Sequence, residues 1–265
     1  MFGIDGKVAI VTGATGVLGG AMARGLAQAG VKVAILGRRR ERAEAVAQDI
    51  IAAGGQALAT PADVLDKAQL EAARDQVVGA WGGIDILVNA AGGTTPEATI
   101  PPDRNFFQMD MDATRYVIDL NLVGTLLPCY VFGEVMAQKQ QGCIINISSM
   151  NAQRAFTRSV AYSAGKTAAE SLTGSLAVEL ATKFGEGMRV NGRRASSSAS
   201  RTARCCSTRR HAHDARAEDH RPHAVRALRR AGRTLLGSEL RHRHWSEHLQ
   251  RDLRRREIER TRHDC

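Results

Sequence analysis

Two side chains that could exchange a proton with a substrate stand four residues apart in Tyr162-Ser163-Ala164-Gly165-Lys166. A spacing of four places Tyr162 and Lys166 on the same face of a helix. An ammonium group beside a phenol stabilises the phenolate form, which suits the phenol for general acid–base chemistry. Ser148 and Ser149 end an apolar run shortly before this pair. These residues predict a site for proton transfer.

A glycine-rich turn stands between the first apolar run and the first helical pattern. Glycines at 13, 16 and 19 allow a tight turn and a close approach of the backbone to a ligand. The helix that follows offers free amide groups to a pyrophosphate. The turn therefore predicts a dinucleotide site. The residues expected to contact the dinucleotide are Thr12, Gly13, Thr15, Gly16, Val17, Leu18 and Gly19.

The end of the second predicted strand bears on the choice of cofactor. An acid at this position binds the ribose 2′-hydroxyl of NAD, whereas an arginine accommodates the 2′-phosphate of NADP. Here Gly37 is followed by Arg38 and Arg39, which favours NADP(H), with NAD(H) as the alternative. Solvated arginines at the start of a helix are the other interpretation. Asp63, followed by Val64, could accept a hydrogen bond from adenine or begin the next helix.

Strand-like and helix-like segments alternate through the first 191 residues. This order predicts an α/β fold with a doubly wound parallel sheet of the Rossmann type, whose ligands bind at the carboxyl ends of the strands. Pro128 should kink the helix that contains it, because proline lacks an amide hydrogen. The predicted strands are 7–12, 31–36, 56–61, 84–88, 143–147 and one from 188, and the predicted helices are 17–29, 40–53, 66–81, 113–139 and 161–184.

Length and composition predict a globular α/β protein rather than a membrane or disulfide-rich secreted protein. The 265 residues are 43% hydrophobic, which suffices for one α/β domain with a sizeable core or at most two small domains. No apolar run is expected to be long enough to span a membrane, and the N-terminal segment does not resemble a signal peptide. Five cysteines do not form a disulfide framework, so the cytoplasm is the expected compartment.

Taken together, the motifs resemble those of the short-chain dehydrogenase/reductase family. The resemblance rests on TGATGVLG after the first strand, on Ser149 thirteen residues before Tyr162, and on Lys166. It also rests on the run after the fourth strand, Asn89, Ala90, Ala91 and Gly92. It covers residues 5–191, and Val17 stands where many members carry a glycine.

The resemblance implies roles for single residues in the interconversion of a ketone and a secondary alcohol. Tyr162 would exchange the proton of the substrate oxygen, and Lys166 would assist it and hold the nicotinamide ribose. Ser149 would hydrogen-bond the substrate oxygen, with Ser148 as the competing assignment. Asn121 matches the asparagine that anchors a proton-relay water, and Asn89 would brace the strand ends.

The substrate class follows from arginines near the predicted pocket. Arginine suits bidentate recognition of a carboxylate, and Arg104, Arg154 and Arg158 occupy segments expected to line the site. The loop GGTTPEATIPPDRNFF is also similar to the mannonate oxidoreductase (fructuronate reductase) branch of the family. A sugar acid is therefore the leading substrate, with a 3-oxoacyl thioester or a generic ketone as alternatives. The helices at 113–139 and 161–184 resemble the family's dimer-forming pair, which predicts a homo-oligomer, although their apolar residues could equally belong to the core.

The amino-acid composition and the net charge of the chain change at about residue 192. Residues 1–191 carry a net charge of −1, whereas residues 192–265 carry +11, all eight histidines and three of the five cysteines. The family's substrate lid and last strand are missing there, and the composition predicts disorder. Residues 219–234, back-translated and read one base later, permit a sequence close to the family's C-terminal part. A frameshift near residue 192 is our interpretation.

Two alternative functions, one for residues 192–265 and one for the whole chain, have weaker support. An arginine-rich segment could neutralise nucleic-acid phosphates, but aromatic residues are nearly absent and no zinc-ligand spacing occurs, so neither nucleic acid nor metal is expected. The chain could instead be an inactive remnant that keeps the cofactor site. The predicted organisation is a catalytic domain at 1–191 and a separate tail at 192–265.

Overall fold

The computed structural model describes residues 3–195, in which strands and helices alternate as predicted. The expectations for residues 196–265 lie outside this part of the chain. The strands are β1 (Val8–Thr12), β2 (Lys32–Gly37), β3 (Gln56–Pro61), β4 (Ile86–Asn89), β5 (Gly142–Ser149) and β6 (Met188–Ala195). The helices are α1 (Val17–Gln28), α2 (Arg40–Ala52), α3 (Lys67–Trp81), α4 (Met111–Gln138) and α5 (Val160–Phe184), with short 3-10 turns η1 (Phe106–Gln108) and η2 (Met150–Ala152).

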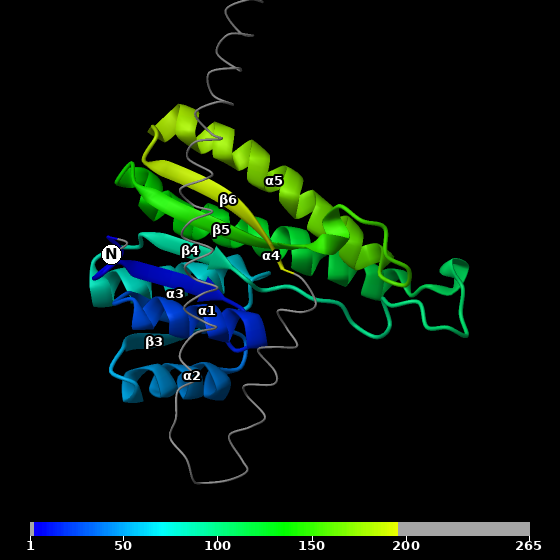
Figure 1. Ribbon diagram of the computed structural model, residues 1–265, viewed down its shortest axis with the longest axis horizontal. Helices are drawn as coiled ribbons and strands as arrows, with labels where there is room; N and C mark the ends of the chain where they lie inside the picture. The colour runs from blue at the N-terminus through cyan, green and yellow to red at the C-terminus, as the bar shows by residue number, and fades with distance from the viewer. Residues whose placement is uncertain (1–2, 196–265) are drawn as a thin grey trace, which may run out of the picture. The chain divides into compact units, whose positions relative to one another are not determined.

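The six strands form one parallel sheet in the order β3-β2-β1-β4-β5-β6. This confirms the doubly wound α/β fold (Figure 1). β6 continues past residue 191, and its last pair joins Ala195 to Ser149 at the carboxyl edge. Within residues 3–195 no strand pairs with the outer side of β6, so β6 is the edge strand of the described sheet.

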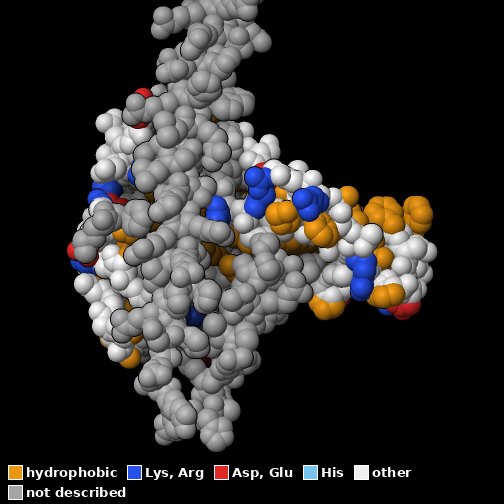
Figure 2. All heavy atoms as spheres, viewed as in Figure 1, with side chains coloured by type: hydrophobic (Ala, Val, Ile, Leu, Met, Phe, Trp, Pro, Cys, Tyr) orange, Lys and Arg blue, Asp and Glu red, His pale blue; other side chains and the backbone are white. Residues whose placement is uncertain are grey.

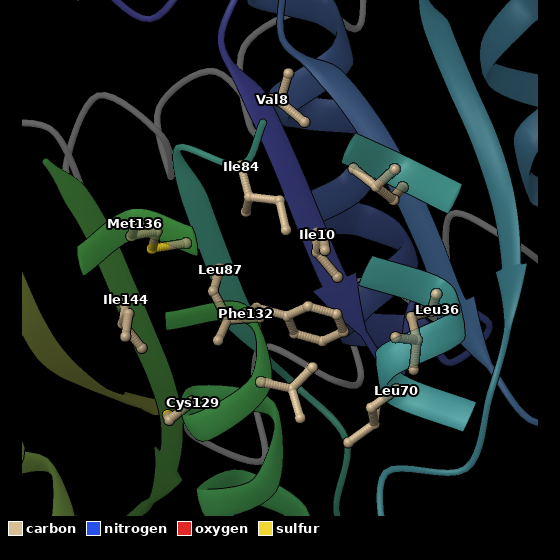
Figure 3. Close-up of a cluster of buried hydrophobic side chains, with 14 of the residues drawn as sticks. Val8, Ile10, Leu36, Leu70, Ile84, Leu87, Cys129, Phe132, Met136 and Ile144 are labelled. Atoms are coloured by element: carbon tan, nitrogen blue, oxygen red, sulfur yellow. The ribbon is translucent and has the colours of Figure 1, made fainter. Parts of the chain in front are cut away.

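Helices cover both faces of the sheet, because side chains of the buried strands alternate between them. On one face Ile10 and Leu36 pack against Leu70 of α3 and Phe132 of α4, a cluster drawn in Figure 3. On the other face the alternate strand residues pack against the alanines of α1 and α2. The carboxyl edge between these layers is left to loops, and the predicted site residues lie there.

Helix α4 bears on two expectations. It is one α-helix from Met111 to Gln138 with the buried Pro128 inside it, and the kink at this proline stays a prediction. It is also long and apolar enough, by length and composition, to cross a membrane, so the prediction that no such segment exists is wrong for α4. In the fold 56% of its most apolar stretch is buried, as expected of a helix that packs on a sheet.

A long arm leads from β4 to α4 and projects from the body of the sheet (Figure 1). Asn105 caps its η1 turn through a reciprocal bond with Gln108. The rings of Phe106 and Phe107 meet edge to face at 5.5 Å, and Phe107 is 92% exposed. Apolar side chains show on this projection in Figure 2. The arm therefore offers aromatic surface to solvent beside the start of α4.

Gly13 allows the ends of β1 and β4 to approach closely. Its φ of +65° favours glycine, and an added Cβ would lie 2.8 Å from the backbone nitrogen of Ala91. Gly54, between α2 and β3, has a similar φ of +83°, but a Cβ added there would have no neighbouring atom within 4 Å. The two glycines therefore separate the cost of backbone conformation from the cost of a steric clash.

We expect Gly13→Ala to lower the free energy of unfolding by several kcal/mol and Gly54→Ala by only about 1–2 kcal/mol. Both variants place a Cβ in the left-handed region, at roughly 1–2 kcal/mol, and the first adds an overpacking cost of about 1–3 kcal/mol. Denaturant unfolding of both variants measures the difference. Equal losses would show that the approach of β1 to β4 does not depend on glycine.

Candidate dinucleotide and catalytic site

The turn after β1 forms a glycine-lined cradle at the start of α1. Gly16 stands at the N-terminus of α1, where no side chain caps the first turn. The first amides of a helix lack intrahelical partners and attract anions. A Cβ on Gly19 would meet the carbonyl oxygen of Gly13, so the turn cannot hold a larger residue there. The uncapped helix end and the tight glycine turn fit the pyrophosphate of a dinucleotide.

Hydrogen bonds join this cradle to neighbouring strand ends. The hydroxyl of Thr12 accepts bonds from the amides of Ala90 and Ala91, both at 3.1 Å. A Cβ on Gly37 would lie 2.8 Å from Cγ2 of Thr15, so the end of β2 closes against the same turn. The residues predicted after β1, β2 and β4 therefore line one continuous edge.

Arg38 links the ends of three elements at this edge. Its Nη1 donates to the hydroxyl of Tyr116 at 3.1 Å and lies 4.0 Å from a carboxylate oxygen of Asp63. Asp63 accepts a bond from the amide of Leu65, and the N-cap of α3 is Asp66. Asp63 is thus not the capping residue of that helix, which corrects one of its two interpretations.

Two other residues predicted near the adenosine have different surroundings. Arg39 occupies the N-cap position of α2 and is exposed. Val64 is 5% exposed and packs beside Gly124 of α4. A Cβ added to Gly124 would lie 2.9 Å from Val64 Cγ2. The Arg39 side chain is therefore accessible to a ligand, whereas Val64 belongs to the buried core beneath this edge of the sheet.

Lys166 is buried at the catalytic end of the edge. Its side chain is 4% exposed, and its Nζ donates to the carbonyl oxygen of Ile147 at 2.9 Å. No carboxylate within residues 3–195 lies in ion-pair range of this ammonium. Burial therefore lowers the pKa of Lys166 to about 8. The helix places Nζ 6.0 Å from the centroid of the Tyr162 ring.

The two serines at the end of β5 differ in their bonding. Ser149 is 8% exposed, and its hydroxyl accepts from the amide of Asn151 at 3.2 Å. Ser148 is buried, and its hydroxyl has no hydrogen-bond partner among the described residues. Asn151 also reaches Ser163, the neighbour of Tyr162, at 3.5 Å. Ser149 is thus the serine tied to the segment that carries Tyr162, which favours it over Ser148.

Asn121 fixes the backbone that follows β4. Its amide nitrogen donates to the carbonyls of Gly93 and Val117, each at 2.7 Å, and its oxygen accepts from the amide of Gly93. A Cβ on Gly92 would lie 2.7 Å from this oxygen and 2.9 Å from Lys166 Nζ. Both atoms thus crowd the position of that Cβ, and the absence of a side chain at Gly92 lets Asn121 and Lys166 lie close together.

A buried polar network lies beneath the site. Asn89 donates to Asn146 at 2.9 Å and to the Cys129 sulfur at 3.2 Å, and Asn146 donates to Thr173 at 2.9 Å. These bonds join β4 and β5 to α4 and α5. Burial raises the pKa of the Cys129 thiol to about 12, so the thiol stays protonated. Asn89 therefore braces the strand ends, the role implied by the family resemblance.

The three arginines assigned to the substrate are not brought together by hydrogen bonds. Arg158 donates to the carbonyl of Ile100 at 2.7 Å and so ties its segment to the arm. Arg104 and Arg154 are exposed. Arg158 is thus engaged in holding the arm, while the other two remain accessible.

Three residues that contribute to the site were not predicted from the sequence. Tyr116 bonds Arg38 from a position 78 residues away, and no local pattern indicates this. The Ile147 carbonyl belongs to the backbone and carries no sequence signal. Asn146 had a usable signal, because a polar residue at a buried position of an apolar strand needs a partner.

The geometry brings a phenol, a buried ammonium and a serine hydroxyl to the carboxyl edge beside a cradle suited to a pyrophosphate. Such an arrangement can bind a dinucleotide and exchange a proton with a substrate oxygen. Among the described residues no cluster of His, Cys, Asp or Glu could hold a metal ion.

Comparison with known proteins identifies the family. The model for the short chain dehydrogenase family matches residues 7–196. UxuB, an uncharacterized oxidoreductase of Bacillus subtilis (strain 168), is 42% identical over 196 residues, covering 71% of this chain and 69% of that protein. The chain spans about two thirds of the length of such curated relatives.

Solved structures of similar proteins support the same family assignment. A Haemophilus influenzae protein with bound NAD that is named a D-mannonate oxidoreductase is 37% identical, with a TM-score of 0.69 over 73% of this chain and 71% of that one. An actinorhodin polyketide ketoreductase with NADPH is 28% identical, with a TM-score of 0.64 over 70% of this chain and 68% of that one. The sequence, the sheet order and the site edge lead to one conclusion: this chain belongs to the short-chain dehydrogenase family of NAD(P)-dependent oxidoreductases.

Proposed function

We propose that the protein interconverts a ketone and a secondary alcohol on a sugar acid, with NADP(H) as the preferred cofactor. The observation that carries the proposal is the buried Lys166 ammonium beside Tyr162, at the same sheet edge as the uncapped helix α1. A buried, unpaired ammonium costs free energy, and a site that uses its charge explains why it is kept.

The chain's own residues would hold the dinucleotide along the edge. The amides of the first turn of α1 would take the pyrophosphate, and Gly13 and Gly19 leave room for it. Ala90, Ala91 and Gly92 would line the wall next to β4. When bound, a nicotinamide cofactor supplies or accepts the hydride, and the protein's contribution is orientation and electrostatics.

Proton transfer would use the phenol and its neighbours. In reduction Tyr162 donates its proton to the carbonyl oxygen of the substrate, and in oxidation the phenolate removes it. Ser149 donates a hydrogen bond to the same oxygen and stabilises its developing charge. The Lys166 ammonium favours the phenolate by charge, and Ile147 and Gly92 keep that ammonium in place.

A sugar acid is supported by two features. Exposed Arg104 and Arg154 lie on the arm and on the segment after Ser149, where a carboxylate would enter. A similar solved structure is named a D-mannonate oxidoreductase. A 3-oxoacyl thioester or another ketone is the alternative substrate, since a polyketide ketoreductase also resembles the chain.

NADP(H) is favoured because no carboxylate occupies the end of β2. Gly37 ends the strand, and Arg38 and Arg39 follow with exposed side chains. A phosphate is better matched by guanidinium groups than a ribose hydroxyl is. NAD(H) remains the alternative, as one solved relative carries NAD and another NADPH.

We expect Tyr162→Phe to lower turnover of fructuronate with NADPH by about 10²-fold or more, because general acid catalysis contributes roughly 10²–10⁴-fold. Tyr130→Phe is the matched control, since Tyr130 is 63% exposed on α4 and should not change the rate. Nicotinamide absorbance measures both variants.

The same assay discriminates the alternatives. Turnover of a 3-oxoacyl thioester but not of fructuronate would replace the sugar acid. Binding of NADPH without turnover of any ketone would favour the inactive remnant. Equal turnover by Tyr162→Phe and the unmodified protein would contradict the catalytic assignment.

We also propose that the protein is a cytoplasmic homo-oligomer that associates through α4 and α5. Both cysteines within the described region, Cys129 and Cys143, are free thiols, which suits a reducing compartment. The solvent face of α5 carries small residues, among them Ser171 and Gly174, together with exposed Val178. Small side chains let a second helix approach closely.

We expect Gly174→Arg to convert an oligomer into a monomer of about 28.5 kDa. No atom lies within 4 Å of an added Cβ at Gly174, so the isolated fold tolerates the change, whereas a partner helix would be displaced. Gly79→Arg on α3 is the control, because its surroundings are equally open. Light scattering gives the masses. A mass unchanged by Gly174→Arg would place the contact elsewhere.

A further inference from the structure

Arg38 is exposed and yet tethered. Its side chain is 63% exposed, but Nη1 is held at 3.1 Å by the Tyr116 hydroxyl and faces Asp63 at 4.0 Å. A surface arginine otherwise samples many rotamers, and fixing it reduces what binding must order. The side chain that would read a 2′-phosphate is therefore positioned before the cofactor arrives.

The tether leaves the useful edge of the guanidinium available. A guanidinium carries five N–H groups in a planar fork and binds phosphate through two parallel bonds. Tyr116 and Asp63 both approach Nη1. Within residues 3–195 no hydrogen bond engages Nε or Nη2 of Arg38. This second edge could take two phosphate oxygens.

Tyr116 is itself fixed by the fold. Its ring packs against a small apolar cluster made by Ala98 of the arm, Val117 of α4 and Ala161 of α5. The same cluster supports Tyr162. The phenol hydroxyl is thus a fixed acceptor on α4, and it reaches across to the end of β2.

We propose that Tyr116 determines cofactor specificity as a positioning residue: its hydroxyl orients Arg38 so that the free Nε–Nη2 edge receives the 2′-phosphate of NADP(H). The inference rests on the proposed preference for NADP(H). It assigns to Tyr116 an effect on the 2′-phosphate alone, because the bond acts through the guanidinium and leaves the pyrophosphate cradle untouched.

The test compares Tyr116→Phe with the unmodified full-length protein in binding NADPH and NADH, followed by nucleotide fluorescence. We expect the Kd for NADPH to rise roughly fivefold to tenfold, the effect of one net hydrogen bond, and the Kd for NADH to change less than twofold. Competition by 2′,5′-ADP should weaken, and competition by ADP should not. Tyr130→Phe on the same helix is the control and should alter neither Kd.

Arg38→Ala separates the two proposals. If Arg38→Ala abolishes the preference for NADPH while Tyr116→Phe preserves it, the role of Tyr116 is overturned and the cofactor preference stands. If Arg38→Ala leaves the ratio of the two Kd values unchanged, the cofactor preference itself fails. Equal weakening of NADPH and NADH by Tyr116→Phe would show a merely structural role and would also overturn the inference.

Discussion

Burial of the Lys166 ammonium is the constraint around which the site is organised. Each pKa unit corresponds to about 1.4 kcal/mol, so the fall from 10.5 to about 8 represents roughly 3 kcal/mol of cost to the charged form. One carbonyl, that of Ile147, meets the ammonium, and no carboxylate in the described region neutralises it. The charge therefore remains available to the neighbouring phenol.

The surrounding elements maintain this arrangement. Helix α5 fixes Lys166 relative to Tyr162, and the Asn146–Thr173 bond attaches that helix to β5. Asn121 holds the backbone after β4 close enough that only glycine fits at position 92. Parallel strands bring these segments to one edge, because their carboxyl ends coincide there.

The elements and most of the site were predictable, because each depended on local pattern. Buried strands were evident as short apolar runs, and the glycine turn and the Tyr162–Lys166 spacing are sequence motifs. Contacts between distant segments were not predictable. Tyr116 meets Arg38 only because α4 and β2 share an edge, and Arg158 turns toward the arm because Ile100 offers a carbonyl. Asp63 resembled a cap by sequence, whereas Asp66 holds that position in the fold.

An NMR titration of isotopically labelled lysines tests the burial of the Lys166 ammonium most directly. The chain has six lysines, and assignment follows from the loss of one resonance in Lys166→Met. The Lys166 resonance should titrate with a midpoint near pH 8, well below the ordinary lysine value of 10.5, because burial disfavours the ammonium. A Lys166 resonance that titrates at 10.5 would contradict a buried ammonium that has no carboxylate partner in the described region, and with it the proton transfer assigned to Tyr162.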